Sequence, residues 1–384
     1  MQLTRVSFHA GLRDYQKQAD DLLAGWKARD DDAIRIAVHN LPKFLKPDVP
    51  WLPKPLTKEE VLNASFDESD ARLTIARWYD FADWSSLEQY VGAVTQDGSP
   101  VARFEAAVEA VIDGHIDVLA KLLRDHPELA RARSTRVTHF DPPVHRATLL
   151  HYVAANGVEG YRQRTPSNAV DVATTLLRAS AEVDALAEMY GGQATTMSML
   201  VSSEHPAKAG VQVALVNTLI DFGAAVEARG SGEWTSPLAT ALAFGYLPAA
   251  QALVRRGARI GTLPIAAGLG STDDAQRLLP TASVLDRHRA TALAAQLGHI
   301  KILQMLLEAG EDPNRYNPKG NHGHSTPLHQ AVWSGHDAVV RLLVERGARL
   351  DIKDTIYEGT PLGWAEYGGR KEIAEYLRTK GGTP

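Results

Sequence analysis

A segment of two predicted helices joined by a glycine turn recurs along this chain, and a fixed period constrains the architecture before any single motif does. The stretch STPLHQAVWSGHDAVVRLLVERGARLD (325–351) is repeated as ATLLHYVAANG (147–157), which continues as VATTLLRASAEVD (172–184) after an insertion. The last two steps between turn glycines are 37 and 34 residues long, close to the ~33 residues of a unit with two helices and a finger-like turn. The turn glycines are Gly114, Gly157, Gly245, Gly270, Gly298, Gly335 and Gly369.

The copies resemble the ankyrin repeat over residues 101–381. That resemblance implies an all-α solenoid of about seven to eight helix-turn-helix units, because one unit cannot bury its apolar face alone and must stack on its neighbours. It also implies protein interaction as the usual activity. Three copies depart from the motif histidine, which we expect to be replaced by Met199, Ala239 and Gly363. The residues that carry the resemblance are Thr326, Pro327, Leu328, His329, Ala331, Gly335, His336, Leu342, Leu343, Gly347 and Ala348.

Residues 1–97 lack the repeat and are predicted to form a helical capping domain, with the repeat domain at 98–384. A separate functional domain is the alternative. Ser69 is predicted to cap the helix that follows it. The stretch IARWYDFADWSSLEQYV (75–91) is similar to helical leaders that precede ankyrin arrays in some bacterial proteins. Its aromatic residues are expected to anchor the leader on the first repeat, and they are Trp78, Phe81 and Trp84.

Composition narrows the classes of partner and compartment. The chain has 41 basic and 46 acidic residues, a net charge of -5 and no sustained run of either sign, so it offers no electrostatic footprint for nucleic acid or an anionic membrane. It has no cysteine, which excludes disulfides, thiolate metal sites and a cysteine nucleophile. No apolar stretch has the length of a signal peptide or a membrane span. The sequence therefore predicts a cytoplasmic protein.

Motifs that would indicate catalysis are missing from the sequence. It contains no G-x-S-x-G, no H-E-x-x-H, no P-loop and no dinucleotide fingerprint. His139, Asp141 and His145 form a loose cluster with acid and base character, but nothing places them opposite a substrate. We therefore predict no cofactor and no enzyme of a familiar type.

Three histidines fall within eight positions, at His322, His324 and His329. The resemblance gives His329 a structural role in the first turn of the inner helix, where its ring ties neighbouring fingers together, and His151 has the same role. His322 and His324 lie in a finger and are either contacts for a partner or candidates for a metal site. A metal needs further ligands, and the sequence places none.

Large aromatic residues stand near the ends of several inner helices, where packing does not require them. Phe244, Trp333 and Tyr367 are the kind of residue that anchors a recognition surface, although an adjacent finger could also cover them. The leading hypothesis is a scaffold that binds a protein or peptide through these residues and the finger tips.

Two insertions suggest a second, different hypothesis. GVEGYRQRTPSNAVD (157–171) and SSEHPAKAGVQVA (202–214) interrupt the second and third copies at the same place, so both loops should rise on one rim. Beside the inner helices they would make a pocket for a small polar or carboxylate ligand, or an atypical active site, with Arg162 as the carboxylate clamp; the insertions could also merely cover the rim. The residues of this predicted pocket are Tyr152, Asn156, Tyr161, Arg162, Gln163, Tyr190, His205 and Trp234.

Overall fold

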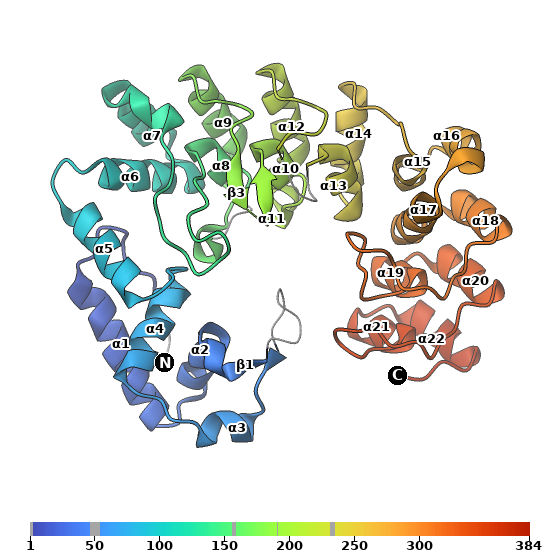
Figure 1. Cartoon of the computed structure of the whole chain (residues 1–384), viewed down its shortest axis with the longest axis horizontal. Coiled ribbons are helices and arrows are strands. Elements are labelled where there is room, and N and C mark those ends of the chain that lie inside the picture. Colours follow the sequence, from blue (N-terminus) through green and yellow to red (C-terminus); the bar gives the residue numbers. More distant parts are fainter. Residues whose placement is uncertain (1–2, 47–53, 156–158, 190, 231–234) are drawn as a thin grey trace. The chain divides into compact units, whose positions relative to one another are not determined.

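Helices dominate both of the compact units into which the chain divides (Figure 1). Unit 1 comprises Met1–Ala225 with Arg229–Thr235, and unit 2 comprises Val226–Ala228 with Ser236–Pro384. Within the described residues the strands form only two short antiparallel pairs, so the predicted all-α class is confirmed. None of the helices described is both long and apolar enough to cross a membrane. This computed structural model describes residues 3–46, 54–155, 159–189, 191–230 and 235–384.

The described residues of the leader form five α-helices, four of which begin at a side chain that accepts a backbone N–H. These caps are Asp30, Thr57, Asp67 and Asp83. The prediction that Ser69 is a cap is wrong: Asp67 caps the helix, and the Ser69 hydroxyl donates to that carboxylate at 2.6 Å. The leader elements are α1 (Leu12–Lys27), α2 (Asp31–Asn40), β1 (Leu45–Lys46), β2 (Lys54–Pro55), α3 (Lys58–Asn63), α4 (Glu68–Trp78) and α5 (Trp84–Thr95).

Three helix pairs follow in the described part of unit 1, and the second and third are interrupted where the sequence predicts. Ser203 in the second insertion donates to the carbonyl of Ala155, next to the first insertion, at 2.9 Å, so the two interruptions do lie side by side. The pairs are α6 (Pro100–Ile112) with α7 (Ile116–Asp125), α8 (Leu149–Val153) with α9 (Ala169–Arg178), and α10 (Thr196–Leu200) with α12 (Gln212–Asp221). The third interruption holds α11 (Glu204–Lys208), and the finger before α10 holds β3 (Ala187–Met189) and β4 (Gly192–Ala194).

The third copy corrects one alignment made from the sequence. Its inner helix is capped by Thr195, whose hydroxyl accepts from the backbone N–H of Ser198 at 3.2 Å. Ser198, and not Met199, therefore occupies the place of the motif histidine. Met199 instead lies one position further along the helix and is buried.

The leader packs directly on the repeats of unit 1. Phe81 is 1% exposed, and the Arg136 guanidinium lies 4.2 Å from the centre of its ring. Arg136 also donates to the carbonyl of Tyr79 at 2.9 Å. Trp78 and Trp84 instead pack against the leader's own apolar cluster, so Phe81 is the predicted anchor that meets the repeats. The predicted boundary between the leader and the repeats, at 97/98, falls between α5 and α6. Both helices belong to unit 1.

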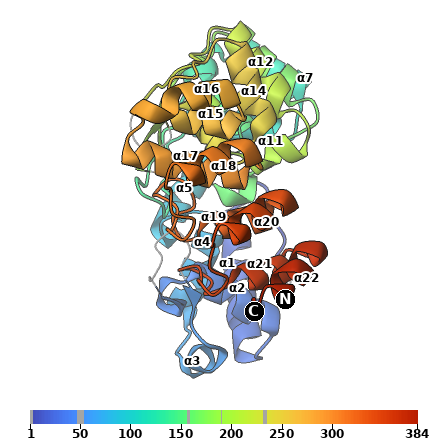
Figure 2. The same ribbon diagram turned by 90° about the vertical axis from the view of Figure 1, so that its right-hand side faces the viewer.

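Unit 2 stacks five helix pairs in chain order, which Figure 2 shows from the side. From α15 to α22, each pair buries small and branched apolar residues against the next, such as Ala294, Leu328 and Val340, so these pairs share a continuous core although no pair could form one alone. The pairs are α13 (Pro237–Ala243) with α14 (Leu247–Arg255), α15 (Leu263–Leu269) with α16 (Thr272–Leu278), α17 (Val284–Gln296) with α18 (Ile300–Glu308), α19 (Pro327–Ser334) with α20 (Asp337–Glu345), and α21 (Pro361–Tyr367) with α22 (Lys371–Thr379).

Buried histidines join neighbouring fingers, as predicted. The backbone N–H of Thr326 donates to Nδ1 of His329, so the ring proton is on Nε2, which donates to the carbonyl of Gly359 at 3.1 Å. His151 repeats this arrangement in unit 1, with Nε2 3.3 Å from the carbonyl of Ala194. Each neutral ring therefore accepts a hydrogen bond from the cap residue of its own helix and donates one to a carbonyl in the next repeat.

A second row of hydrogen bonds runs past the turn glycines of unit 2. In three successive repeats, the residue after the turn glycine donates to a carbonyl near the end of the preceding inner helix. Its side chain thereby covers the preceding turn glycine. The bonds are His299 Nε2 to Gly268 at 2.9 Å, His336 Nε2 to Gln296 at 3.0 Å, and Arg370 Nη2 to Trp333 at 2.7 Å.

Replacing Gly298 by alanine is expected to lower the free energy of unfolding of unit 2 by about 2–3 kcal/mol. Gly298 has φ +83°, and an added Cβ would lie 2.8 Å from the His336 ring, so backbone strain of about 1–2 kcal/mol is joined by the loss of the partly buried hydrogen bond from His336 to Gln296. Gly310→Ala is the control, because Gly310 has φ +93° with open space beside it. Urea unfolding measures both variants, and equal losses would contradict the proposed role of the covered turn.

Candidate functional site

A groove rich in aromatic side chains lies along α19 and α21 and the fingers that precede them. We call it the aromatic groove, and its volume is about 660 Å³, within the ~300–1,000 Å³ typical of ligand sites. It is lined by His322, His324, Gln330, Trp333, Tyr357, Gly359, Gly363, Trp364 and Tyr367.

Its rings are arranged around Trp333. The Tyr367 ring lies nearly parallel to it, with centroids 6.3 Å apart and planes 18° apart. Trp364 meets it edge-on at 6.0 Å. Tyr367 is 87% exposed, Tyr357 64% and Trp333 47%, so these three contribute little to the core and present wide apolar faces to solvent. Exposed aromatic clusters of this kind mark interaction sites.

The finger that carries Tyr357 is held in place by Asp354, which is buried. Its carboxylate accepts from the backbone N–H groups of Ile356, Tyr357 and Gly359 at 2.6–2.9 Å and from Nε1 of Trp364 at 2.9 Å. Burial alone would raise the pKa of Asp354, but these hydrogen bonds hold it below its ordinary value. The carboxylate thus fixes both the finger and the Trp364 ring before any partner arrives.

The structure brings two of the three predicted aromatic contacts together. Trp333 and Tyr367 line the aromatic groove, whereas Phe244 is 43% exposed at the C-cap of α13 and does not. Sequence reasoning missed Tyr357 and Trp364. A signal was present, because both lie in the same copy as Tyr367, one in the finger and one in the first turn after Pro361.

His322 and His324 also line the aromatic groove, with ring centroids 6.1 Å apart. Nε2 of His322 lies 3.2 Å from the carbonyl of Ala243 and 3.3 Å from Nε2 of Gln296, so this ring ties the finger to inner helices of unit 2. Burial lowers the pKa of both rings. In the described chain no three acidic or histidine side chains are grouped as metal ligands would be.

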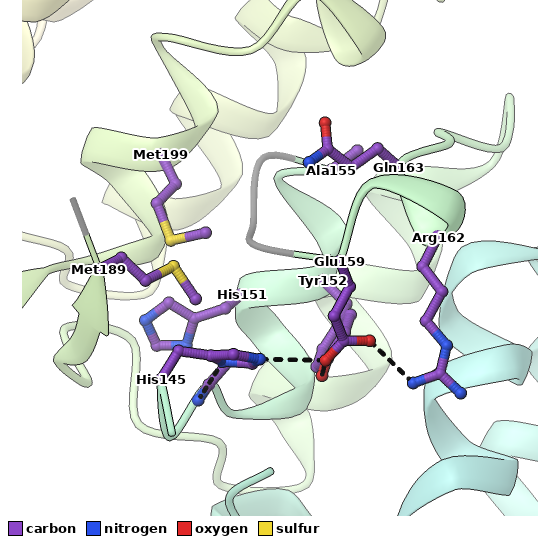
Figure 3. Close-up of a pocket in the computed structure, with 10 residues that line it drawn as sticks. His145, His151, Tyr152, Ala155, Glu159, Arg162, Gln163, Met189 and Met199 are labelled. Carbon is purple, nitrogen blue, oxygen red and sulfur yellow. Dashed lines mark hydrogen bonds and ion pairs between the residues drawn. The ribbon is translucent and has the colours of Figure 1, made fainter. Parts of the chain in front are cut away.

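A second, much smaller cavity lies beside the first insertion of unit 1 (Figure 3). It brings the predicted residues Tyr152, Arg162 and Gln163 together. Its volume of about 20 Å³ holds roughly one water molecule and is far too small for a metabolite. The cavity is lined by His145, Ala147, His151, Tyr152, Ala155, Glu159, Arg162, Gln163, Met189 and Met199.

Beside this cavity lies a buried ion network of two arginines and two glutamates. Arg162 donates to Glu105 at 2.5 Å and to Glu159 at 3.0 Å, and its side chain is 1% exposed. Arg136 lies 3.7 Å from Glu105 and 3.8 Å from Glu159. The Arg136 guanidinium also donates to the hydroxyl of Tyr161. The four charges balance, which is the condition for holding them away from water.

Glu159 is the best-supported member of the network. It accepts from Nε2 of His145 at 3.0 Å and from the hydroxyl of Tyr152 at 2.7 Å. The backbone N–H of Ala147 donates to the other ring nitrogen of His145, which fixes the tautomer. Burial would raise the pKa of Glu159, but Arg136 and Arg162 lower it far below its ordinary value.

The expectation that Arg162 clamps a ligand's carboxylate is therefore wrong, because carboxylates of the chain itself occupy its guanidinium. His145 belongs to the same network, whereas Asp141 is exposed, so the loose acid and base cluster does not assemble. His205 is half-buried in α11 and does not line the cavity. Three other predicted pocket residues lie outside the described residues: Asn156, Tyr190 and Trp234.

Comparison with known proteins agrees with the repeat geometry. Residues 263–354 and 292–383 match the family model for ankyrin repeats in three copies. The chain is 28% identical over 290 residues, 73% of its length, to the ankyrin repeat and KH domain-containing protein mask-1 of Caenorhabditis elegans. It is 39% identical over 88 residues, 23% of its length, to the ankyrin repeat and SAM domain-containing protein 6 of Mus musculus. In both cases it spans 10% of the relative's length.

A shorter relative is covered almost completely. Cyclin-dependent kinase 4 inhibitor B of Bos taurus is 30% identical over 120 residues, which are 24% of this chain and 91% of the inhibitor. The repeat period, the histidine ties and these matches together show that the chain belongs to the ankyrin-repeat proteins.

Proposed function

We propose that this protein is an interaction scaffold that binds a protein or peptide partner in the aromatic groove. The observation that carries the proposal is the exposure of Trp333, Tyr357 and Tyr367 in one groove. The fold leaves these faces unpacked, while Asp354 holds the finger between them in place. A rigid aromatic surface binds a partner with little loss of conformational entropy, which is what an interaction site requires.

The relatives support a protein partner. One of them is named as an inhibitor of a cyclin-dependent kinase, so at least one protein with these repeats acts on another protein. The lining of the aromatic groove carries no lysine or arginine, and a nucleic acid would need basic residues. We therefore propose a protein partner rather than a nucleic acid or membrane, and a cytoplasmic location that fits a chain without cysteine. Fractionation of the source cells would test the location.

Trp333→Ala and Tyr367→Ala should each weaken partner binding at least tenfold, because truncating a central aromatic anchor typically costs more than about 1–2 kcal/mol. The partner would be captured from source cells with the wild-type chain, identified, purified and titrated against each variant. Phe222→Ala is the matched control, since Phe222 is exposed at the end of α12 in unit 1. Equal affinity of the wild type and both groove variants would rule out this surface.

A further inference from the structure

The residues that line the aromatic groove carry no ionised side chain, although charged residues lie next to it. The Asp354 carboxylate is occupied by three backbone N–H groups and by Trp364. The Arg370 guanidinium is occupied by the carbonyl of Trp333, through Nε at 3.2 Å and Nη2 at 2.7 Å. The histidines of the lining have a pKa lowered by burial and are neutral at pH 7. An occupant therefore finds no free charge among the lining residues.

Hydrogen-bond donors are available along the ring edges of the groove. Within the described residues, the indole N–H of Trp333 and the hydroxyls of Tyr357 and Tyr367 make no hydrogen bond to the chain, whereas Trp364 already donates to Asp354. An indole N–H can only donate, and a phenol donates readily. The groove thus combines apolar ring faces with donors along their edges.

From this combination we infer that the occupant of the aromatic groove is a proline-rich segment of the partner in the polyproline II conformation, an inference that rests on the proposed function. Such a segment exposes carbonyl acceptors and flat apolar rings, and its prolines have no N–H that would need an acceptor. It is preformed and therefore loses little entropy on docking against an aromatic surface. Both properties complement donors and ring faces.

Other peptide occupants match the lining less well. A basic segment would gain from the ring faces, but the lining offers it no free carboxylate. An extended strand with ordinary residues would bring an N–H at every residue, and the side-chain acceptors of the lining are confined to Gln330, the histidine rings and the phenol oxygens. An acidic segment would need arginine or lysine, and the lining has neither. These alternatives differ from a proline-rich segment in charge and in N–H content, so matched peptides can separate them.

The test is calorimetric titration of the full-length protein with four capped peptides of equal length. The probe is PPLPPLPP, and the comparison peptides replace its prolines by alanine (AALAALAA), its leucines by lysine (PPKPPKPP), or its leucines by glutamate (PPEPPEPP). We expect PPLPPLPP to bind at least tenfold more tightly than the alanine peptide, and its affinity to be unchanged between 50 mM and 500 mM salt. Preference for a charged peptide that disappears at high salt, or tighter binding of the alanine peptide, would overturn the inference.

Three variants tie the binding to the groove. Trp333→Ala should lower the affinity for PPLPPLPP at least tenfold. Tyr367→Phe removes only a hydroxyl and should lower this affinity severalfold. That loss would measure the hydrogen bond that Tyr367 donates to the peptide. Phe222→Ala should leave the affinity unchanged. If Tyr367→Phe binds as the wild type does, or if Phe222→Ala weakens binding as Trp333→Ala does, the assigned role of the donors and of the groove is wrong.

Failure of this inference differs from failure of the proposed function. If the purified partner loses affinity with Trp333→Ala while no proline peptide binds, the groove is the interaction site and its occupant is not proline-rich. If the partner binds all groove variants normally, the interaction site itself lies elsewhere, whatever the peptides do. Competition of PPLPPLPP with the partner is the result expected when both statements hold.

Discussion

Replacing Arg162 by methionine is expected to lower the free energy of unfolding of unit 1 by about 3–5 kcal/mol, because one cation is removed and its carboxylates stay buried. Glu105 and Glu159 are 1% and 3% exposed and would be left with Arg136, which lies farther from both. Urea unfolding followed by circular dichroism measures the loss.

Arg164→Met is the matched control for this prediction. Arg164 is two residues away and also pairs with two carboxylates, Asp113 and Glu109, but its side chain is 37% exposed, so the loss should stay below about 1 kcal/mol. The double variant Arg162→Met with Glu105→Leu should regain part of the stability, since it removes an unpaired charge together with its former partner. Equal losses for Arg162→Met and Arg164→Met would show that the buried network does not stabilise unit 1.

Lowering the pH from 7.5 to 5 should destabilise each unit by about 2 kcal/mol through one buried histidine. Burial lowers the pKa of His151 and of His329 to about 4, against about 6.5 in the unfolded chain. Below pH 6.5 this histidine binds a proton in the unfolded chain, whereas the buried ring of the folded state stays neutral until the pH approaches 4. The stability is therefore fully present above that pH and is lost as the pH falls toward 4. The other histidines of unit 2 with a pKa lowered by burial, such as His299 and His336, act in the same direction.

His329→Gln isolates this contribution in unit 2. Glutamine is a usual partner at the third helical position of a capping box and does not titrate. The variant should lose some stability at pH 7.5, because the bond to the carbonyl of Gly359 is altered, but its drop between pH 7.5 and pH 5 should be smaller by about 2 kcal/mol. An unchanged drop would mean that His329 is not held neutral by the fold. Chemical unfolding of the variant and the wild type at the two pH values distinguishes a smaller drop from an unchanged one.

The repeat architecture could be read from the sequence because its signals are local. The Thr-Pro-Leu-His start, the turn glycine and the apolar stripe all lie within one copy, and in the structure Thr326 caps the inner helix while Gly335 has a positive φ. The wrong assignments, of a helix cap and of a motif-histidine position, arose where two nearby residues suited the same position equally well. Asp67 and Ser69 both suit a cap, and the third copy lacks the proline and the histidine that would have fixed Ser198 rather than Met199 in register.

The ion network of unit 1 could not be predicted, because Glu105 and Arg136 are far in the chain from Glu159 and Arg162. Arg136 comes from the finger before α8 and Arg162 from the first insertion, and both meet Glu105 and Glu159. One signal was available: Glu105 lies three residues before Val108 on the apolar face of α6, and both are buried. A carboxylate on such a face requires a buried partner. Arg162 was singled out correctly, but the sequence alone does not say that its partners are internal.

The groove was half predicted, for a related reason. Trp333 and Tyr367 stood out because each ends an inner helix and has no packing role. Tyr357 joined them only through the finger that Asp354 folds back toward α21, and the path of a finger is not encoded by helical periodicity. Trp364 lies on α21 itself, three residues before Tyr367, so its position could have been read from the sequence. His324 lies in the preceding finger, before α19, and its ring centroid is 5.9 Å from that of Trp364, which explains why a residue first weighed as a metal ligand lines an aromatic surface.

Photo-crosslinking from the groove tests the central claim most directly. A photoreactive phenylalanine analogue would replace Tyr367 in one variant and Phe222 in a second, and both would be irradiated in source cells. Because Tyr367 is 87% exposed within the groove, we predict that position 367 captures one partner in high yield through a defined segment, while position 222 captures it weakly or not at all. Capture of the same partner from position 222 but not from position 367 would contradict the account.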